Sequence, residues 1–356
     1  MLELNILVIV SNLIDMSKFL VIKKKISEFN KRIYVSGDKS LSIRWVLFAS
    51  LANGKSKANN LLMSEDVLAT IEAIKKLGIK VIINKKECII FGKGIDGYKY
   101  KKGLTIDAKN SGTLGRLILG LLINSPDPIN LIGDKSLSKR DFRRVSDPLS
   151  KFGVKFKLRS NNLLPLTLYG SSKLKPVKYY EKKGSAQCKS SIIFAAMRTK
   201  GITKIIAKKS RDHTELLCEH LKLSVHVKKN KNNDEIKINK VKEINTLNYD
   251  IPSDISSSAF FIVLAALSNH SELTIKNVNI NPSRIGIITI LKKMGVKIFF
   301  KNKKIYKGEK KADIKIKSTN NLKPINCPPS LNSGAIDEFL VIFLVAAKAK
   351  GVSYFK

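Results

Sequence analysis

The chain has 356 residues, of which 44% are hydrophobic, and its net charge at neutral pH is +38. This length and apolar content exclude a disordered chain and leave room for two domains with their own cores. The four cysteines form no CxxC pair, and the four histidines are scattered. This argues against a disulfide framework and a metal site, and it predicts free thiols in a reducing, cytoplasmic compartment.

The charge has two interpretations. A nucleic-acid-binding protein favours arginine for base and phosphate contacts and aromatic residues for stacking. Here only ten of the 66 basic residues are arginines, and the lysines are spread along the whole chain. Dispersed lysine favours a compositional bias over a binding surface. A basic nucleic-acid-binding repeat protein stays open as the alternative, and a steep salt dependence of a selective affinity would support it.

The pattern of the N-terminal stretch is not typical of a membrane or export signal, and we expect none there. The apolar run 6–10 is too short to span a membrane, no basic segment precedes it, and Asp15 follows it. Met16 opens a more ordinary protein start. We therefore expect residues 1–15 to be an extension outside the fold, and we expect no membrane partner.

The stretch GDKSLSIR at 37–44 precedes an apolar run at 45–52. A glycine turn carries Lys39 and Ser40 into the first turn of a helix, and Arg44 follows one turn later. Free backbone N–H groups, the positive end of the helix dipole and two cations then face one spot. This predicts a site for an anion such as a phosphate monoester. A capped surface helix with two solvated cations is the alternative for this stretch alone.

Four segments repeat one pattern, in which an amphipathic helix ends in an apolar residue and a turn and is followed by a short strand. The turn residues are Gly78, Gly153, Ser224 and Gly295, which lie 75, 71 and 71 residues apart. Glycine just past a helix favours a left-handed cap, and the alternation after it predicts a half-buried strand. The even spacing predicts an α/β fold built from repeated units.

A second type of helix alternates with the first and is almost entirely apolar, which predicts a buried core helix. We expect such helices at 41–52, 113–123, 189–196, 258–267 and 337–347. This gives four full units and a fifth that stops after its core helix. Because repeat units cannot bury their faces alone, an exposed apolar edge follows.

The N-termini of these core helices are the candidate site. The turns at 110–113 and 185–187 place small residues beside donors, which favours close approach of a ligand to the backbone. At 256–258 ordinary capping by serine is favoured. Asp337 heads an apolar helix and suits either a cap or a general base; on its own the cap is favoured.

Two further elements retain arginine in a lysine-rich chain. The first is 133–144, which contains the pair Lys139 and Arg140 and ends in Arg143 and Arg144. The second is SRDHTE at 210–215, where Ser210 suits an N-cap. Retained arginine indicates bidentate recognition of carboxylate or phosphate. His213 is interpreted as a capping or packing residue.

Taken together, the motifs resemble the 5-enolpyruvylshikimate-3-phosphate (EPSP) synthases, or 3-phosphoshikimate 1-carboxyvinyltransferases. The resemblance runs from residue 31 to 356 and is carried by GDKSLSIR at 37–44, NSGT at 110–113, GDKSLSKRDFRRV at 133–145, SAQCKSS at 185–191, SRDHTE at 210–215, PSDISSSAFF at 252–261, NPSRIG at 281–286 and AIDEF at 335–339.

The resemblance implies a two-domain enolpyruvyl transferase fold of βαβαββ units around an interdomain cleft, with the sixth unit missing. Domain I would comprise residues 16–33 and 248–356 and be discontinuous and incomplete. Domain II would comprise residues 34–247 with three units. The family implies a monomer with small-molecule partners, no nucleic acid, no metal and no cofactor.

Site residues follow from the same resemblance. Contacts to shikimate 3-phosphate are implied for Lys39, Ser40, Arg44, Ser185, Ala186, Gln187, Arg211 and Asp337. Contacts to phosphoenolpyruvate are implied for Lys39, Gly112, Arg140 and Gln187. Asp337 matches the catalytic proton acceptor, which moves its interpretation away from a bare cap.

The implied reaction transfers the enolpyruvyl group of phosphoenolpyruvate to the 5-hydroxyl of shikimate 3-phosphate and releases phosphate. It belongs to the shikimate pathway to chorismate and the aromatic amino acids, and it is the target of glyphosate, to which Gly112 predicts sensitivity. Two later family motifs, which supply an acid and two arginines, are absent from these 356 residues. We therefore expect a fragment that is inactive or weak; robust turnover would contradict this.

The sister transferase that acts on UDP-N-acetylglucosamine is the nearest alternative. It is disfavoured because Lys39, Ser40 and Arg44 suit a small phosphate, and because no cysteine lies in the loop at 133–140. Competition between shikimate 3-phosphate and the UDP-sugar separates the two.

Overall fold

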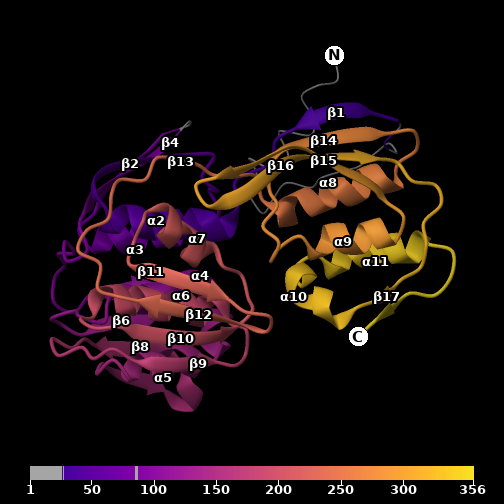
Figure 1. Cartoon of the computed structure of the whole chain (residues 1–356). Coiled ribbons are helices and arrows are strands. Elements are labelled where there is room, and N and C mark those ends of the chain that lie inside the picture. The colour runs from indigo at the N-terminus through magenta and orange to yellow at the C-terminus, as the bar shows by residue number, and fades with distance from the viewer. Residues whose placement is uncertain (1–25, 27, 85–86) are drawn as a thin grey trace.

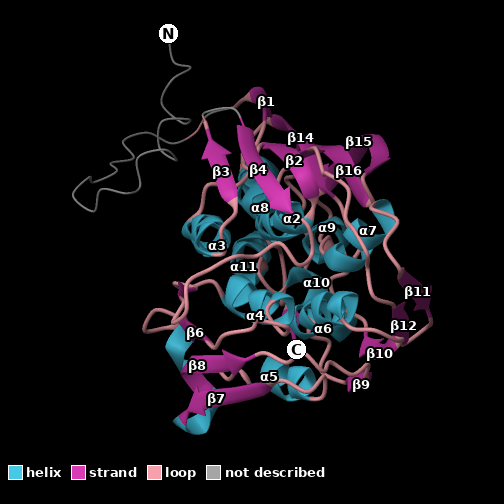
Figure 2. Cartoon of the chain, turned by 90° about the vertical axis from the view of Figure 1, so that its left-hand side faces the viewer, coloured by secondary structure: helices cyan, strands magenta, loops and turns pink. Residues whose placement is uncertain are grey.

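The computed structural model describes residues 26, 28–84 and 87–356. The expected extension, residues 1–15, lies outside the described residues. The chain forms two lobes, each with helices inside and sheets outside (Figure 1). In the larger lobe three sheets surround a central group of helices (Figure 2).

Four sheets share one strand order and one set of directions. In each, a first strand pairs parallel with a second, which pairs antiparallel with a third, which pairs antiparallel with a fourth. The sheets are β13(Tyr249–Asp250)–β2(Asn53–Asn59)–β4(Glu87–Lys93)–β3(Lys80–Ile83), β5(Thr105–Asp107)–β6(Ile129–Ile132)–β8(Leu163–Tyr169)–β7(Lys155–Arg159), β9(Lys178–Glu181)–β10(Thr203–Lys208)–β12(Asn233–Ile238)–β11(Val225–Lys229) and β1(Asn30–Ile33)–β14(Glu272–Asn279)–β16(Glu309–Lys317)–β15(Lys297–Tyr306).

A fifth sheet contains only the parallel pair β17(Asn326–Cys327) and β18(Tyr354–Phe355). It corresponds to the first two strands of the other four sheets. The predicted repeat of βαβαββ units is therefore confirmed, with the fifth unit represented by its first part.

The core helices fill the space between the sheets. They are α2(Lys39–Leu51), α4(Gly112–Leu121), α6(Ala186–Arg198), α8(Ile255–Leu267) and α11(Phe339–Lys348). Helix α2 is buried at every position from Leu41 to Leu51, because its sequence is apolar except for Ser42, Arg44 and Ser50. In α11, by contrast, Leu340 is 80% exposed, and Phe260 of α8 is 66% exposed. These side chains form the apolar edge that the sequence predicts.

The outer helices are α3(Glu65–Lys76), α5(Arg143–Ser150), α7(His213–His220) and α9(Gly286–Lys293), with the short α10(Asn332–Ala335) beside α9. Gly78, Gly153 and Gly295 adopt the expected left-handed conformation with φ of 84°, 100° and 91°. Ser224, the turn residue of the remaining unit, does not take this conformation; there Lys222 is left-handed with φ of 54°. The chain has already turned there, since Leu223 N–H donates to the carbonyl of Cys218.

Two hydrophobic cores share the chain. One contains buried residues from Leu41 to Ile251, and the other contains Val35 and buried residues from Ile255 to Val345. Strand β1 precedes α2 in sequence but pairs with β14 of the smaller lobe, and β13 precedes α8 but pairs with β2 of the larger lobe. The chain thus passes from one core to the other at 36–40 and again at 252–254. The sequence analysis placed these two crossings at 33/34 and 247/248.

The two crossing segments lie side by side. Asp38 N–H donates to the carbonyl of Pro252 at 2.8 Å, and Lys39 N–H donates to Oδ2 of Asp254 at 3.1 Å. The start of α2, where the sequence predicts an anion site, therefore lies at the junction of the lobes.

Candidate active site

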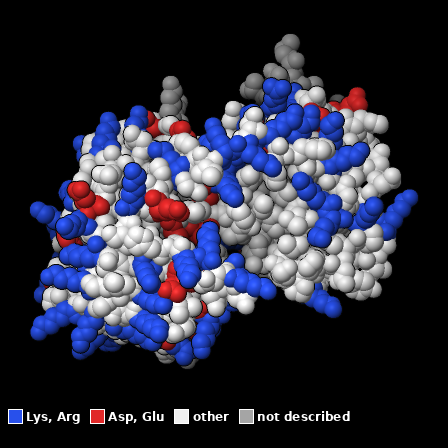
Figure 3. All heavy atoms as spheres, in the orientation of Figure 1, with Lys and Arg blue, Asp and Glu red and all other residues white. Residues whose placement is uncertain are grey.

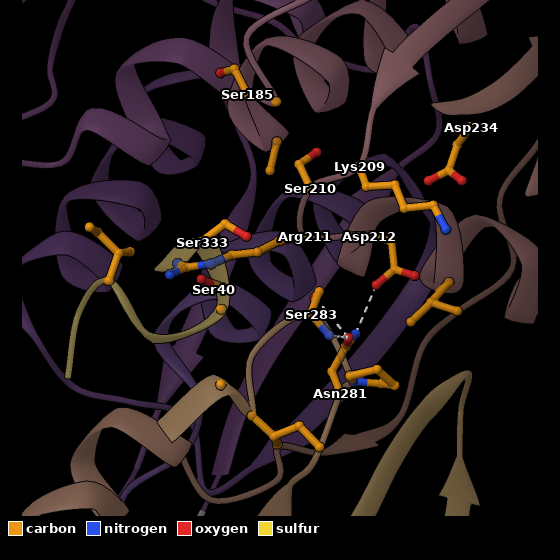
Figure 4. Close-up of a pocket in the computed structure, with 18 of the residues that line it drawn as sticks. Ser40, Ser185, Lys209, Ser210, Arg211, Asp212, Asp234, Asn281, Ser283 and Ser333 are labelled. Carbon is orange, nitrogen blue, oxygen red and sulfur yellow. Dashed lines mark hydrogen bonds between the residues drawn. The ribbon is translucent and has the colours of Figure 1, made fainter. Parts of the chain in front are cut away.

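A cleft of about 800 Å³ opens between the lobes (Figure 4). Both lobes line it, so that segments more than 200 residues apart in the sequence face each other across it. From the larger lobe the lining includes Ser40, Arg44, Thr113, Arg144, Ser185, Ala186, Gln187 and Arg211, and from the smaller lobe Asn281, Ser283, Ser333 and Asp337.

Three core helices begin at the wall of the cleft. Asp38 caps α2 by accepting from Leu41 N–H at 2.9 Å. Ser111 caps α4 in the same way, and Ser185 caps α6. The residues that follow these caps line the cleft, so the positive ends of three helix dipoles converge there, as an anion site requires.

Two predicted caps are wrong. Helix α8 is capped by Asp254, whose Oδ1 accepts from Ser256 N–H at 2.6 Å, and not by the serines that follow it. Helix α7 begins after Asp212 and not after Ser210. In the first case a carboxylate two residues upstream satisfies the N–H groups and leaves the Ser256 hydroxyl free for a contact with Glu338.

Arg44 is almost fully buried, with 3% of its surface exposed, yet it lines the cleft. Its Nε donates to Thr214 Oγ1 at 2.7 Å, its Nη2 to Ser190 Oγ at 3.1 Å and its Nη1 to the carbonyl of Ser40 at 3.1 Å. Burial lowers the pKa of Arg44 to about 10, against the opposing charges of Glu215 and Asp38. The guanidinium therefore stays protonated at neutral pH and is held at one position.

A second cationic cluster lies behind Gln187. Gln187 accepts from Arg116 Nη1 at 2.6 Å and donates to Thr113 Oγ1 at 3.0 Å. A Cβ on Gly112 would lie 2.8 Å from Arg116 Nη1 and 3.2 Å from Arg140 Nη1. The structure thus brings together the predicted residues Gly112, Arg140 and Gln187, although Gly112 and Arg140 do not themselves line the cleft.

Arg116 is a residue that the sequence analysis missed. It projects from the otherwise apolar helix α4 and is 7% exposed. Burial lowers its pKa to about 10, and the charges of Arg144 and Arg140 act in the same direction. An arginine inside an all-apolar helix is the signal that could have identified it, because such a charge needs a buried partner.

Asp337 lies between α10 and α11 and reaches across the cleft. Its Oδ2 accepts from Arg211 Nη2 at 2.5 Å, and Arg284 Nη1 lies 3.9 Å from the same oxygen. The prediction that Asp337 opens the core helix is wrong: α11 begins at Phe339, and Asp337 turns toward the opposite lobe instead. Burial alone would raise the pKa of Asp337, but Arg211, Arg284 and Lys39 outweigh it and hold that pKa below its ordinary value.

Arg284 is the second residue without an assigned role in the sequence analysis. It is 4% exposed, and its Nη2 donates to Ser256 Oγ at 2.6 Å. Carboxylate oxygens of Asp254, Asp337 and Glu338 each lie 3.9 Å from it. Arg284 therefore fixes the electrostatics around Asp337 from within its own lobe.

Lys39, like Gly112 and Arg140, is a predicted residue that does not line the cleft. Its Nζ lies 3.5 Å from Asp66, and half of its side chain is exposed. Its charge still contributes to the lowered pKa of Asp337.

Other contacts tie the lobes together. His213 Nδ1 lies 2.7 Å from Glu309 Oε1, and both side chains are fully buried. Asn281 donates to Asp212 Oδ1 at 2.9 Å (Figure 4). His213 is thus a packing residue at the junction of the lobes.

Neither a metal centre nor a membrane-spanning helix is found in the part of the chain that the structure describes. Its His, Cys, Asp and Glu side chains form no group of three that could hold an ion. None of its helices is long and apolar enough to cross a bilayer.

Known proteins resemble this chain over nearly its whole length. The sequence profile of EPSP synthase (3-phosphoshikimate 1-carboxyvinyltransferase) matches residues 23–356. The 3-phosphoshikimate 1-carboxyvinyltransferase of Ruthia magnifica is 41% identical over 339 residues, which cover 94% of this chain and 75% of the relative. That of Zymomonas mobilis is 37% identical over 335 residues, which cover 94% and 74%.

Solved structures agree with the sequence matches. EPSP synthase from Acinetobacter baumannii superposes with a TM-score of 0.83 at 35% identity, covering 92% of this chain and 73% of that one. The enolpyruvyl transferase NikO from Streptomyces tendae has a TM-score of 0.68 at 14% identity, covering 91% of this chain and 74% of that one, and shares the fold.

Proposed function

This chain belongs to the EPSP synthase family, and we propose that the cleft between its lobes is where the two substrates meet. The family reaction is the transfer of an enolpyruvyl group from phosphoenolpyruvate to shikimate 3-phosphate in the shikimate pathway. The chain spans about three quarters of the length of the relatives it matches.

One observation carries the assignment: cations and helix N-termini line the same cleft from both lobes. We assign the phosphate of shikimate 3-phosphate to Arg44, Ser40 and Arg211, with Ser185, Ala186 and Gln187 at the start of α6 completing the site. Backbone N–H groups and hydroxyls suit a dianion, and a buried guanidinium binds it without competition from water. The low dielectric of the cleft strengthens each of these contacts.

We assign phosphoenolpyruvate to the neighbouring cluster of Gly112, Arg140 and Gln187. Arg116, which donates to Gln187, adds a further positive charge. The two guanidinium groups that converge beside Gly112 suit a small anion. Lys39 would join both substrates after exchanging Asp66 for a substrate anion.

We assign proton transfer to Asp337. Paired with Arg211 at 2.5 Å, its carboxylate is a weak base. A substrate phosphate that draws Arg211 away would raise the pKa of Asp337 and free it to accept the proton of the 5-hydroxyl. As Asp337 takes the proton of the 5-hydroxyl, the hydroxyl oxygen bonds to C2 of phosphoenolpyruvate and C3 gains a proton from solvent. In the second step C3 loses a proton to solvent, the C2–O bond to the phosphate breaks with its electron pair leaving on phosphate, and the double bond is restored.

The domain division extends the proposal to the whole chain. The sequence-based bounds are residues 16–33 and 248–356 for domain I and residues 34–247 for domain II; the two cores support this two-domain division with both crossings moved a few residues onward, to 36–40 and 252–254. We further propose a cytoplasmic monomer that binds small molecules and not nucleic acid. Lysines and arginines are spread over both lobes on the face in Figure 3 and are not gathered into one groove.

Calorimetric titration with shikimate 3-phosphate tests the proposal. We expect one saturable site per chain and loss of binding in Arg44→Met. A wild-type chain that fails to bind shikimate 3-phosphate, or that binds it equally well without Arg44, would refute the assignment. Titration with the UDP-sugar serves as the control for substrate class.

A further inference from the structure

A buried ion pair lies next to Arg44 and has no part in the function proposed above. Lys189 of α6 and Glu215 of α7 approach to 2.6 Å, with 0% and 4% of their side chains exposed. Removing two charges from water costs several kcal/mol per ion, and the attraction between them only partly offsets it. A pair at this depth therefore calls for a physical explanation.

The pair is adjacent to the groups that hold Arg44. Ser190 follows Lys189 on α6, and Thr214 precedes Glu215 on α7. The hydroxyls of Ser190 and Thr214 bond to the Arg44 guanidinium and, at 2.7 Å, to each other. Two neighbouring pairs of residues thus provide both the contacts of Arg44 and the charges beside it.

Glu215 is the natural partner for Arg44. It follows Thr214, whose hydroxyl accepts from Arg44 Nε at 2.7 Å, and its negative charge favours the protonated form of Arg44. Within the described part of the chain, neither carboxylate oxygen of Glu215 has a hydrogen bond of good geometry. A buried carboxylate so placed would form a bidentate pair with a guanidinium if no other cation held it.

Arg44 nevertheless bonds to neutral oxygens. Its contacts in the structure are two hydroxyls and a backbone carbonyl, while Lys189 takes the carboxylate. We propose that Lys189 masks Glu215, so that Arg44 keeps its charge and its orientation for an incoming anion. Lys189 and Glu215 are then positioning residues, and this role rests on the proposed binding of shikimate 3-phosphate by Arg44.

Glu215 also contributes to keeping Arg44 charged. Burial disfavours the charged form of Arg44, and a nearby carboxylate opposes that effect. Lys189 and Glu215 together add no net charge, so they support the guanidinium without cancelling the attraction for substrate.

The test uses charge variants of the full chain. Lys189→Met should weaken the binding of shikimate 3-phosphate about tenfold or more, because Glu215 is then free to pair with Arg44. Glu215→Gln should bind at least as tightly as wild type. The affinity of the double variant K189M/E215Q should return to within about threefold of wild type, because the carboxylate that could pair with Arg44 and the lysine that held it are both absent.

A matched control is Lys204→Met, which breaks the ion pair with Glu235 at 2.9 Å in the sheet of β10 and β12. It should leave the affinity unchanged. Urea unfolding of every variant separates loss of stability from loss of binding.

The direction of the affinity change in K189M and in E215Q distinguishes a positioning role from a structural one. A merely structural pair predicts that K189M and E215Q weaken binding alike, in step with their stability, and this result would overturn the inference. So would unchanged affinity in K189M. If K189M does not fold, two other single variants decide. A loss of affinity in E215Q then overturns the inference, whereas retained affinity both in E215Q and in Lys189→Arg supports it. A wild type that fails to bind shikimate 3-phosphate refutes the proposed function instead.

Discussion

Substitution of Gly112 by alanine probes the phosphoenolpyruvate site with a single methyl group. Gly112 opens α4, and a Cβ there would lie 2.8 Å from Arg116 Nη1, where ordinary contact begins at 3.4 Å. The guanidinium must therefore retreat by about 0.6 Å. It holds Gln187 at 2.6 Å, so the retreat strains this hydrogen bond.

The magnitude follows from two opposing effects. Loss of a charge-assisted hydrogen bond costs about 1.5–3 kcal/mol. Replacement of glycine in a helix returns about 0.5–1 kcal/mol. We expect Gly112→Ala to be destabilised by about 0.5–2.5 kcal/mol, and we expect its affinity for phosphoenolpyruvate to fall about tenfold. Shikimate 3-phosphate, bound at Arg44, should lose less than about twofold.

Calorimetry measures both affinities, with shikimate 3-phosphate saturating in the titrations of phosphoenolpyruvate and of glyphosate. The control is Gly115→Ala in the same helix, where the new Cβ meets only Phe142 and Ala108 at 3.4 Å or more. Unchanged binding of phosphoenolpyruvate and glyphosate in Gly112→Ala would refute the placement of that site. A parallel loss of shikimate 3-phosphate would show that the substitution acts through the fold.

Three further predictions concern the junction and the edge of the lobes. Arg211→Ala removes the partner that holds the pKa of Asp337 low. The ion pair stabilises the fold above the ordinary carboxyl pKa and is lost as pH falls through the lowered one. Urea unfolding should therefore show a difference from wild type at neutral pH that closes as pH falls below the ordinary range of an aspartate. His213→Ala leaves Glu309 buried without this contact and should cost about 3 kcal/mol of unfolding free energy; a cost below about 1 would contradict the buried junction. Leu340→Ser, at an 80% exposed position, should change that free energy by less than about 0.5 kcal/mol in the same assay, and a larger loss would mean that the edge is covered.

The local sequence was sufficient to predict most of the turns and the apolar core helices. The motif GDKSLS occurs at 37–42 and at 133–138, and in both copies the aspartate accepts a backbone N–H three residues on. The first copy continues into an apolar run and becomes the thirteen-residue helix α2, whereas the second continues into charged residues and becomes a three-residue 3-10 turn at 137–139. The apolar pattern after the motif, and not the motif, decides the element.

Contacts between distant segments could not be predicted from the sequence pattern. The partners Arg116 and Gln187 lie 71 residues apart, and nothing local to either predicts the other. The exchange of β1 and β13 between lobes was misplaced by a few residues, because four- and two-residue strands have little pattern of their own. For Asp337 a cap and a cleft residue have the same local signature, and Arg211 in the other lobe decides between them.

A structure of the chain with shikimate 3-phosphate would locate the phosphate site. We expect the phosphate within hydrogen-bond distance of Arg44 and Ser40, with Arg211 moved from Asp337 to the ligand. A ligand bound elsewhere, or one bound in the cleft while the 2.5 Å contact between Arg211 and Asp337 persists, would contradict the proposed function.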